Sequence, residues 1–173
     1  MKIRKSARAL LLNNKNQIFL TKIQDENLID PKNQTRKDSY WITVGGSLEI
    51  GETEIDALKR ELYEETGIRR TNIIEPPAWH EKVMLNFHGN NVIFSQNFYV
   101  TYVDADKISL ENLTDYEINV LQDYKWWADD ELKKSKEQFF PDGFIELIIP
   151  IMKGNIPSET IEITEDRIKN LYR

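Results

Sequence analysis

The sequence has 173 residues, 40% of them hydrophobic and 10% aromatic, a size and composition that suit one globular domain with its own core. Its 23 basic and 29 acidic residues give a net charge of -6, which argues against binding to the backbone of nucleic acids. Because the sequence has no cysteine and two histidines, it lacks a disulfide framework, a thiol nucleophile and the ligands of a typical structural zinc site.

No stretch of the sequence predicts a secretory or membrane segment. The basic start lacks the apolar core and the cleavage site of a signal peptide. The longest apolar run, residues 144–152, is too short for a membrane span and contains Glu146 and Pro150. Together with the missing cysteines, these features predict a cytoplasmic protein with no membrane partner.

The first half of the chain predicts strands and then a helix. Residues 5–12 and 17–23 have strand composition, and the polar segment 13–16 between them predicts a hairpin turn. Residues 24–39 are polar and predict a long loop, and residues 40–44 predict a short strand that ends at Gly45-Gly46. Residues 53–66 predict a helix, because Thr53 and Asp56 have capping-box spacing and Gly67 suits a left-handed C-cap.

The second half adds strands and shorter helices. Residues 79–87 and 92–103 are apolar and aromatic, and His88-Gly-Asn-Asn91 predicts the turn between them. Residues 115–124 are compatible with a loop or a short helix, residues 125–128 with a short strand, and residues 129–135 with a helix. Residues 142–153 predict a helix that bends or ends near Pro150.

The remaining segment, 154–173, is predicted to be a C-terminal tail. It becomes charged after Pro157, and its apolar side chains are candidate docking points: Ile161, Ile163, Ile168 and Leu171. No linker or repeat interrupts the chain, so residues 1–173 are predicted to form a single domain. Strands before and after a central helix, with further helix at the end, predict an α/β sandwich around a mixed sheet.

The predicted helix 53–66 has two faces. On a helical wheel Glu64 lies about 60° to one side of Glu61, and Glu65 lies about 40° to the other. The apolar residues Ile55, Leu58 and Leu62 form a separate stripe. Like charges at these spacings destabilise a helix by about 0.2–0.5 kcal/mol per pair, and a hard divalent cation such as Mg²⁺ would remove that repulsion.

The alternative to a metal site is a solvent-exposed acidic face without a ligand. If the three glutamates are considered alone, this alternative is favoured. The glutamates stand in a longer motif, however. The segment 46–68 has Gly46, five residues, Glu52, seven residues, and then Arg60-Glu61-Leu62-Tyr63-Glu64-Glu65-Thr66-Gly67-Ile68. This segment, here called the box, resembles the Nudix box at every defined position. Residues 126–132 also look like this family.

The resemblance implies the Nudix α/β/α sandwich and a MutT-like hydrolase. The expected reaction is the Mg²⁺- or Mn²⁺-dependent cleavage by water of a diphosphate bond in a nucleoside diphosphate linked to another group. By position, the metal ligands would be Glu61, Glu64 and Glu65, with the Gly46 carbonyl as an addition. Arg60 would orient the glutamates through charge-assisted hydrogen bonds. The resemblance also allows a homodimer, although no feature of this sequence indicates one.

Three points stay open. Many members have Pro-Gly-Gly before the box where this chain has Val44-Gly45-Gly46, a change expected to affect loop stiffness and not chemistry. Glu117 is the candidate general base, with an exposed loop acid as an equal alternative, and three other acids compete for the role: Glu111, Asp115 and Asp123. Marks of the ADP-ribose, dinucleoside-polyphosphate and coenzyme A subgroups are absent, which leaves a nucleoside triphosphate or a nucleotide sugar.

Candidate substrate contacts lie outside the box. Trp79 and Phe87 are candidate platforms for a nucleotide base, as are Phe98 and Tyr102, although strand aromatics more often pack in the core. Arg36, in the polar loop with Lys37, is the candidate phosphate contact, with solvated surface charge as the alternative. A non-catalytic nucleotide-binding or regulatory module on the same fold is the competing function, although such modules usually lose a metal-binding glutamate.

Overall fold

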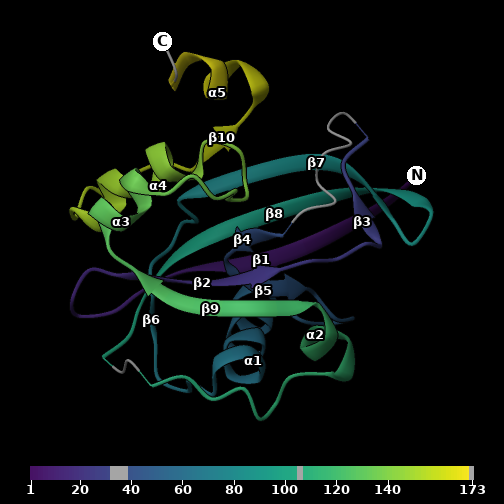
Figure 1. Cartoon of the computed structure of the whole chain (residues 1–173), viewed down its shortest axis with the longest axis horizontal. Coiled ribbons are helices and arrows are strands. Elements are labelled where there is room, and N and C mark those ends of the chain that lie inside the picture. Colours follow the sequence, from purple (N-terminus) through teal and green to yellow (C-terminus); the bar gives the residue numbers. More distant parts are fainter. Residues whose placement is uncertain (32–38, 105–106, 172–173) are drawn as a thin grey trace.

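The computed structural model describes residues 1–31, 39–104 and 107–171 of the chain. One twisted sheet runs through the molecule, with helices on both sides (Figure 1). Its main path has the order β10-β7-β8-β1-β2-β4, with β3, β5, β6 and β9 paired beside it. The strands are β1 (Lys2–Leu12), β2 (Ile18–Ile23), β3 (Leu28–Ile29), β4 (Tyr40–Ile42), β5 (Val44–Ser47), β6 (Asn72–Ile73), β7 (Trp79–Phe87), β8 (Asn90–Tyr102), β9 (Leu121–Trp127) and β10 (Ile161–Ile163).

The sheet is mixed, which confirms the predicted α/β class. β1 and β8 run parallel along their shared length, from Lys2 beside Val92 to Leu12 beside Tyr102. β10 is parallel to β7, whereas the pairs β1–β2, β1–β5, β2–β9 and β7–β8 are antiparallel. The long parallel pairing places the chain start beside residues about ninety positions later, a juxtaposition that shapes the cleft described below.

The helices cover both faces of the sheet. They are α1 (Glu54–Thr66), α2 (Asp115–Val120), α3 (Asp129–Lys134), α4 (Phe144–Met152) and α5 (Glu165–Leu171). In Figure 1, α1 lies on one side of the sheet, and α3 and α4 lie on the other. Among the described helices, none is long and apolar enough to cross a membrane.

Strand β1 divides the core because its side chains alternate between the two faces. Ala9 and Leu11 pack with Leu58 and Leu62 of α1. Leu10, on the opposite face, packs in a second cluster that includes residues of α3 and α4. Burial of each leucine stabilises the fold by roughly 1.5–3 kcal/mol, so α1 is held firmly on its face of the sheet.

Most of the predicted elements are present, with several differences. The segment 115–124 contains α2 and then the start of β9, which is longer than the predicted strand 125–128. The predicted loop 24–39 contains the two-residue β3, and the tail forms β10 and α5. Of the predicted docking points, Ile163 is buried and Ile161 and Ile168 pack against the core, whereas Leu171 is exposed. Pro150 lies inside α4, two residues before its end.

Candidate active site

The acidic face of α1 is positioned by the ends of the helix and by its apolar stripe. The Thr53 hydroxyl accepts a hydrogen bond from the Asp56 amide at the first turn. Gly67 ends the helix with a φ of 75°, a left-handed conformation that glycine adopts at no steric cost. Leu58 and Leu62 are buried, whereas Glu61, Glu64 and Glu65 are each partly exposed.

Strand β5 passes directly against this acidic face. A Cβ atom on Gly46 would lie only 2.4 Å from the Glu61 Oε1 atom, so the position accepts no side chain while Glu61 keeps its place. The Gly45 amide donates to the Glu65 carboxylate at 2.7 Å. Glycine at position 46 therefore allows the backbone of β5 to approach the Glu61 carboxylate closely.

Arg60 joins the loop of the box to its helix. Its guanidinium binds both oxygens of Glu52, at 2.6 and 3.0 Å, and donates to the Ser47 carbonyl at 3.0 Å. It also donates to Glu61 at 2.9 Å and to Glu64 at 3.3 Å. These bonds lower the pKa of Glu52 to about 2, chiefly through the side-chain bond from Arg60. Arg60 thus fixes two of the three acidic side chains relative to the loop.

The acidic face carries more negative charge than its surroundings balance. Burial raises the pKa of Glu61, against the opposing effect of Arg60, and the charges of Glu64 and Glu117 raise it further. Burial also raises the pKa of Glu65 well above its usual value, and Glu61 adds to this effect. A cation placed here would favour the ionised forms of both carboxyl groups.

The donor set fits a hard divalent cation. It consists of carboxylate oxygens and a neighbouring backbone carbonyl, the ligands that Mg²⁺ prefers. Among the described residues, no group of three or more His, Cys, Asp or Glu side chains is already arranged to hold a metal ion. The carboxylates of Glu61 and Glu64 accept hydrogen bonds from Arg60, and the carboxylate of Glu65 accepts one from the Gly45 amide. These bonds fix the positions of the three carboxylates.

A cleft of about 220 Å³ adjoins this face. Glu65, Gly45 and Gly46 form part of one wall, and Glu117 lies on another. Apolar side chains from β2, β3, β4, β7, β8 and the region around α2 line much of the rest: Ile23, Leu28, Ile42, Phe87, Phe94, Leu110, Leu113, Val120 and Leu121. A charged edge beside an apolar pocket suits a ligand with a phosphate part and a flat organic part.

Glu117 is the one of the four candidate bases that lines the cleft. Its Oε1 atom accepts from the Thr114 amide at 3.1 Å and from the Thr114 hydroxyl at 2.7 Å, in the capping box of α2. Its Oε2 atom has no hydrogen-bond partner within the described part of the chain. The competitors Glu111, Asp115 and Asp123 are exposed.

The predicted substrate contacts have different outcomes. Phe87 lines the cleft. The prediction for Trp79 is wrong, because its side chain is 0% exposed and packs between Phe98 and Phe144 in the core, where no ligand can reach the ring. Arg36 and its neighbour Lys37 lie outside the described residues.

Two arginines that line the cleft were not predicted from the sequence. Arg4 and Arg8 are the only basic side chains among its described lining residues. The available signal was the alternation of Arg4, Ser6 and Arg8, which in a strand places all three side chains on one face. The predicted strand began at residue 5, whereas β1 begins at Lys2, so Arg4 lay outside the prediction.

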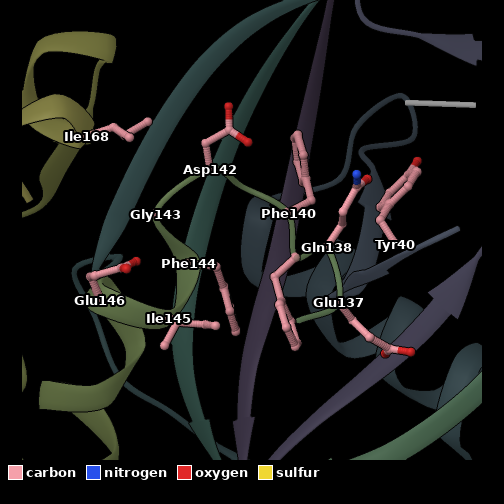
Figure 2. Close-up of a pocket in the computed structure, with 11 residues that line it drawn as sticks. Tyr40, Glu137, Gln138, Phe140, Asp142, Gly143, Phe144, Ile145, Glu146 and Ile168 are labelled. Atoms are coloured by element: carbon pink, nitrogen blue, oxygen red, sulfur yellow. The ribbon is translucent and has the colours of Figure 1, made fainter. Parts of the chain in front are cut away.

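A second hollow, of about 410 Å³, lies where the segment before α4 meets α5 (Figure 2). Its acidic side chains, Glu137, Asp142 and Glu146, come from that segment and from the first turn of α4, as Figure 2 shows. Glu137 is bonded to Lys22 at 2.9 Å and to the Trp41 indole. No arginine or lysine is among the described residues that line this hollow, so it suits a phosphate group poorly.

The whole of the site falls within a family match. The sequence model of the NUDIX domain matches residues 2–148. The chain belongs to the Nudix family. The box, the adjacent cleft and every candidate site residue named so far lie inside the matched region, whereas β10 and α5 lie beyond it. No curated protein sequence matches the chain.

Solved Nudix structures have the same fold. A MutT protein from Methanosarcina mazei is 22% identical, with a TM-score of 0.57, and the match covers 90% of this chain and 97% of that one. A Nudix hydrolase from Clostridium perfringens is 13% identical, with a TM-score of 0.59 and coverage of 88% and 98%. An Ap4A hydrolase from Caenorhabditis elegans is 18% identical, with a TM-score of 0.56 and coverage of 87% and 98%. These likenesses establish the α/β Nudix fold with flanking helices.

Proposed function

We propose that this Nudix protein is a Mg²⁺- or Mn²⁺-dependent pyrophosphohydrolase, which cleaves the diphosphate bond of a nucleoside diphosphate linked to another group. The observation that carries the proposal is the acidic face of α1, whose three carboxylates have Arg60 as their one ion-pair partner among the described residues and which packs against Gly46 at the edge of a cleft. A nucleotide ligand would place its phosphates at this face and its base in the apolar part of the cleft.

In this proposal the carboxylates of Glu61, Glu64 and Glu65 hold the divalent ion, and the Gly46 carbonyl is an additional ligand. When bound, such an ion supplies charge neutralisation and Lewis-acid polarisation at the diphosphate. Burial, together with neighbouring carboxylates, raises the pKa values of Glu61 and Glu65, and this supports the assignments because a bound cation would favour the ionised form of both groups. Glu64, whose side chain is 37% exposed, is open to solvent on that face.

Arg60 acts as a positioning residue. Its two bonds to Glu52 fix the guanidinium, which in turn holds Glu61 and Glu64. The fork geometry of arginine makes this possible, because one planar group reaches several oxygens at once. Loss of such support typically weakens metal binding by about 10- to 100-fold.

Glu117 is proposed as the general base. One of its oxygens is fixed by Thr114, and the other is available to accept a proton from the attacking water. The water oxygen forms a bond to phosphorus as the bond to the bridging oxygen breaks, and the bridging oxygen leaves with the second phosphate. The charge of Glu117 raises the pKa of both Glu61 and Glu65, which supports the closeness of Glu117 to the reacting centre.

The nucleotide base would contact Phe87 in the apolar part of the cleft. Similarity alone does not select a substrate, because the structural relatives include a MutT protein, an Ap4A hydrolase and an ADP-ribose pyrophosphatase. A nucleoside triphosphate and a nucleotide sugar are the two substrate classes considered. The cytoplasmic location, the homodimer and the single domain over residues 1–173 stay predictions.

The test is a substrate panel with Mg²⁺, run on the wild-type protein and on Glu64→Gln. We expect phosphate-containing products from at least one nucleotide and a loss of about 100-fold or more in kcat for the variant, as for groups that stabilise the transition state. The matched control is Glu159→Gln, which removes an exposed acid outside the family match. Nucleotide binding without product release would instead support the non-catalytic module, and equal activity of Glu64→Gln would refute the metal assignment.

A further inference from the structure

One face of the sheet extends beyond the helix that covers it. Ala7 and Ala9 of β1 belong to the core cluster under α1, and alternation along the strand places Lys5 on the same face. Lys5 is exposed, so α1 does not reach this part of the sheet. Arg4 and Arg8 project to the opposite face, where they line the cleft. The sheet itself therefore separates this open part of the face from the cleft.

Four neighbouring strands place polar side chains on the open face. Residues that lie directly opposite each other in paired strands project to the same side of a sheet. Ser95 of β8 is opposite Lys5 of β1 on one side and opposite Lys82 of β7 on the other. His80, two residues before Lys82, shares this face, and Glu162 of β10 is opposite His80. The face thus carries a serine, a histidine and a carboxylate in a row, with a lysine on each side of the serine.

The serine, the histidine and the carboxylate are hydrogen-bonded in series. The Nδ1 atom of His80 lies 2.8 and 3.0 Å from the two carboxylate oxygens of Glu162, and its Nε2 atom lies 3.0 Å from the Ser95 Oγ atom. A carboxylate only accepts hydrogen bonds, so in the neutral ring Nδ1 carries the proton and Nε2 accepts from the Ser95 hydroxyl. A nucleophilic serine needs this order of groups: a hydroxyl that donates to a base, and a base that a third group orients.

Solvent reaches all five of these side chains. Ser95 and His80 are partly exposed, with 19% of the His80 side chain accessible, and the side chain of Glu162 is 64% exposed. Lys5 and Lys82 are exposed, and neither forms an ion pair within the described part of the chain. Two ammonium groups beside a hydroxyl supply positive charge at the place where an attacked carbonyl oxygen becomes negative.

We propose that Ser95, His80 and Glu162 form a second catalytic site, which hydrolyses small carboxylic esters. Ser95 is the nucleophile, His80 is the general base, and Glu162 is a positioning residue that holds the imidazole ring. Lys5 and Lys82 stabilise the negative charge on the carbonyl oxygen. Glu162 belongs to β10, which lies beyond the matched NUDIX domain, so this site depends on a segment outside the family match.

The reaction proceeds in two steps, as for other nucleophilic serines. The Ser95 Oγ atom forms a bond to the carbonyl carbon while its proton passes to the Nε2 atom of His80. The bond from the carbon to the alcohol oxygen then breaks, and that oxygen takes the proton from Nε2, which leaves an acyl group on Ser95. Water attacks the acyl group, gives one proton to Nε2 and releases the carboxylic acid, and Ser95 recovers its proton from His80.

The first test is the hydrolysis of 4-nitrophenyl acetate, measured with EDTA so that no divalent ion takes part. We expect Ser95→Ala and His80→Gln each to lower kcat/KM by about 100-fold or more, the usual contribution of a positioned base and its nucleophile. The matched controls Ser158→Ala and His88→Gln remove an exposed hydroxyl and an exposed imidazole elsewhere and should keep the wild-type constants. Thermal unfolding checks the fold of each variant. A Ser95→Ala protein as active as wild type, or an equal loss in a control, would overturn the proposal.

The positioning role of Glu162 has its own measurement. Glu162→Gln should lower kcat by about tenfold or more and leave KM within about threefold, because the orientation of the base matters as the proton moves and not as the ester binds. Glu159→Gln, which removes an exposed acid three residues earlier, is the control and should change neither constant. An unchanged kcat for Glu162→Gln would show that Glu162 does not position His80.

A covalent label tests the nucleophile in the wild-type protein, where no variant has to fold. An alkyl fluorophosphonate reacts with an activated serine through a bond from Oγ to phosphorus, with loss of fluoride and of the hydroxyl proton. Peptide mass mapping should find the adduct on Ser95 and not on Ser158, and its absence from Ser95 would overturn the proposal. Because the two sites lie on opposite faces, Glu64→Gln should keep the esterase activity and Ser95→Ala should keep the diphosphate cleavage.

Discussion

Replacement of Gly46 by alanine tests the contact between β5 and the acidic face most sharply. The added Cβ atom would lie 2.4 Å from the Glu61 Oε1 atom and 2.7 Å from its Cδ atom. An ordinary contact begins near 3.4 Å, so the Glu61 carboxylate has to move by about 1 Å. A displacement of about 1 Å at a reacting centre lowers the rate by about 100-fold, which is about 2.7 kcal/mol in activation free energy.

The assay is kcat/KM on the best nucleotide, with thermal unfolding of each variant as a check on the fold. Gly51→Ala is the matched control, because a Cβ atom there meets no atom within 4 Å. Gly51 has a φ of 84°, so its replacement should lower stability by about 1 kcal/mol and leave the catalytic constants near the wild-type values. A Gly46→Ala protein that keeps kcat/KM within about threefold of wild type would show that catalysis does not depend on the contact between Gly46 and Glu61.

Three further predictions concern the base, the core and the loop of the box. Glu117→Gln should lower kcat by about 100-fold or more and change KM little, because a general base acts only while the proton is transferred. Stopped-flow or steady-state kinetics measure both constants, and an unchanged kcat would show that Glu117 is not the general base. Trp79→Leu should lower the free energy of unfolding by about 2–4 kcal/mol, measured with urea, while KM of the folded protein stays the same; a selective rise of KM would restore Trp79 as a substrate contact. Glu52 has its pKa lowered to about 2 in the folded protein, so its contribution to stability is present above the unfolded pKa, near 4.5, and is lost as pH falls toward 2. Urea midpoints measured from pH 5 to pH 2 should therefore fall more steeply for wild type than for Glu52→Gln, and parallel profiles would argue against the Arg60 bond as the cause.

The parts of the fold that local chemistry dictates could be predicted from the sequence. The helix α1 follows from its apolar stripe and from Thr53 and Gly67 at its ends. The turn between β1 and β2 follows from Asn13, whose side chain accepts from the Lys15 and Gln17 amides at 3.0 Å. β3 and β10 could not be predicted, because strands of two and three residues are stabilised by their partners and not by their own sequence.

The walls of the cleft could not be predicted for a related reason. Arg4 meets Phe87 and Phe94 only because β1 pairs with β8, and β8 with β7, across a long sequence separation. Trp79 and Phe87 belong to the same strand and have similar composition around them, yet one is in the core and the other lines the cleft. Alternation assigns two side chains to the same or to opposite faces, but it does not say where along a face the core ends.

In the proposed function, the acidic face of α1 holds the divalent ion on which diphosphate cleavage depends. The most direct measurement is the cleavage rate as a function of Mg²⁺ concentration, for wild type, Glu64→Gln and the control Glu159→Gln. We expect a saturable Mg²⁺ dependence that Glu159→Gln preserves, and a maximal rate for Glu64→Gln that is at least about 100-fold below that of the wild-type protein. Cleavage that is independent of Mg²⁺, or a Glu64→Gln protein with the wild-type curve, would contradict it.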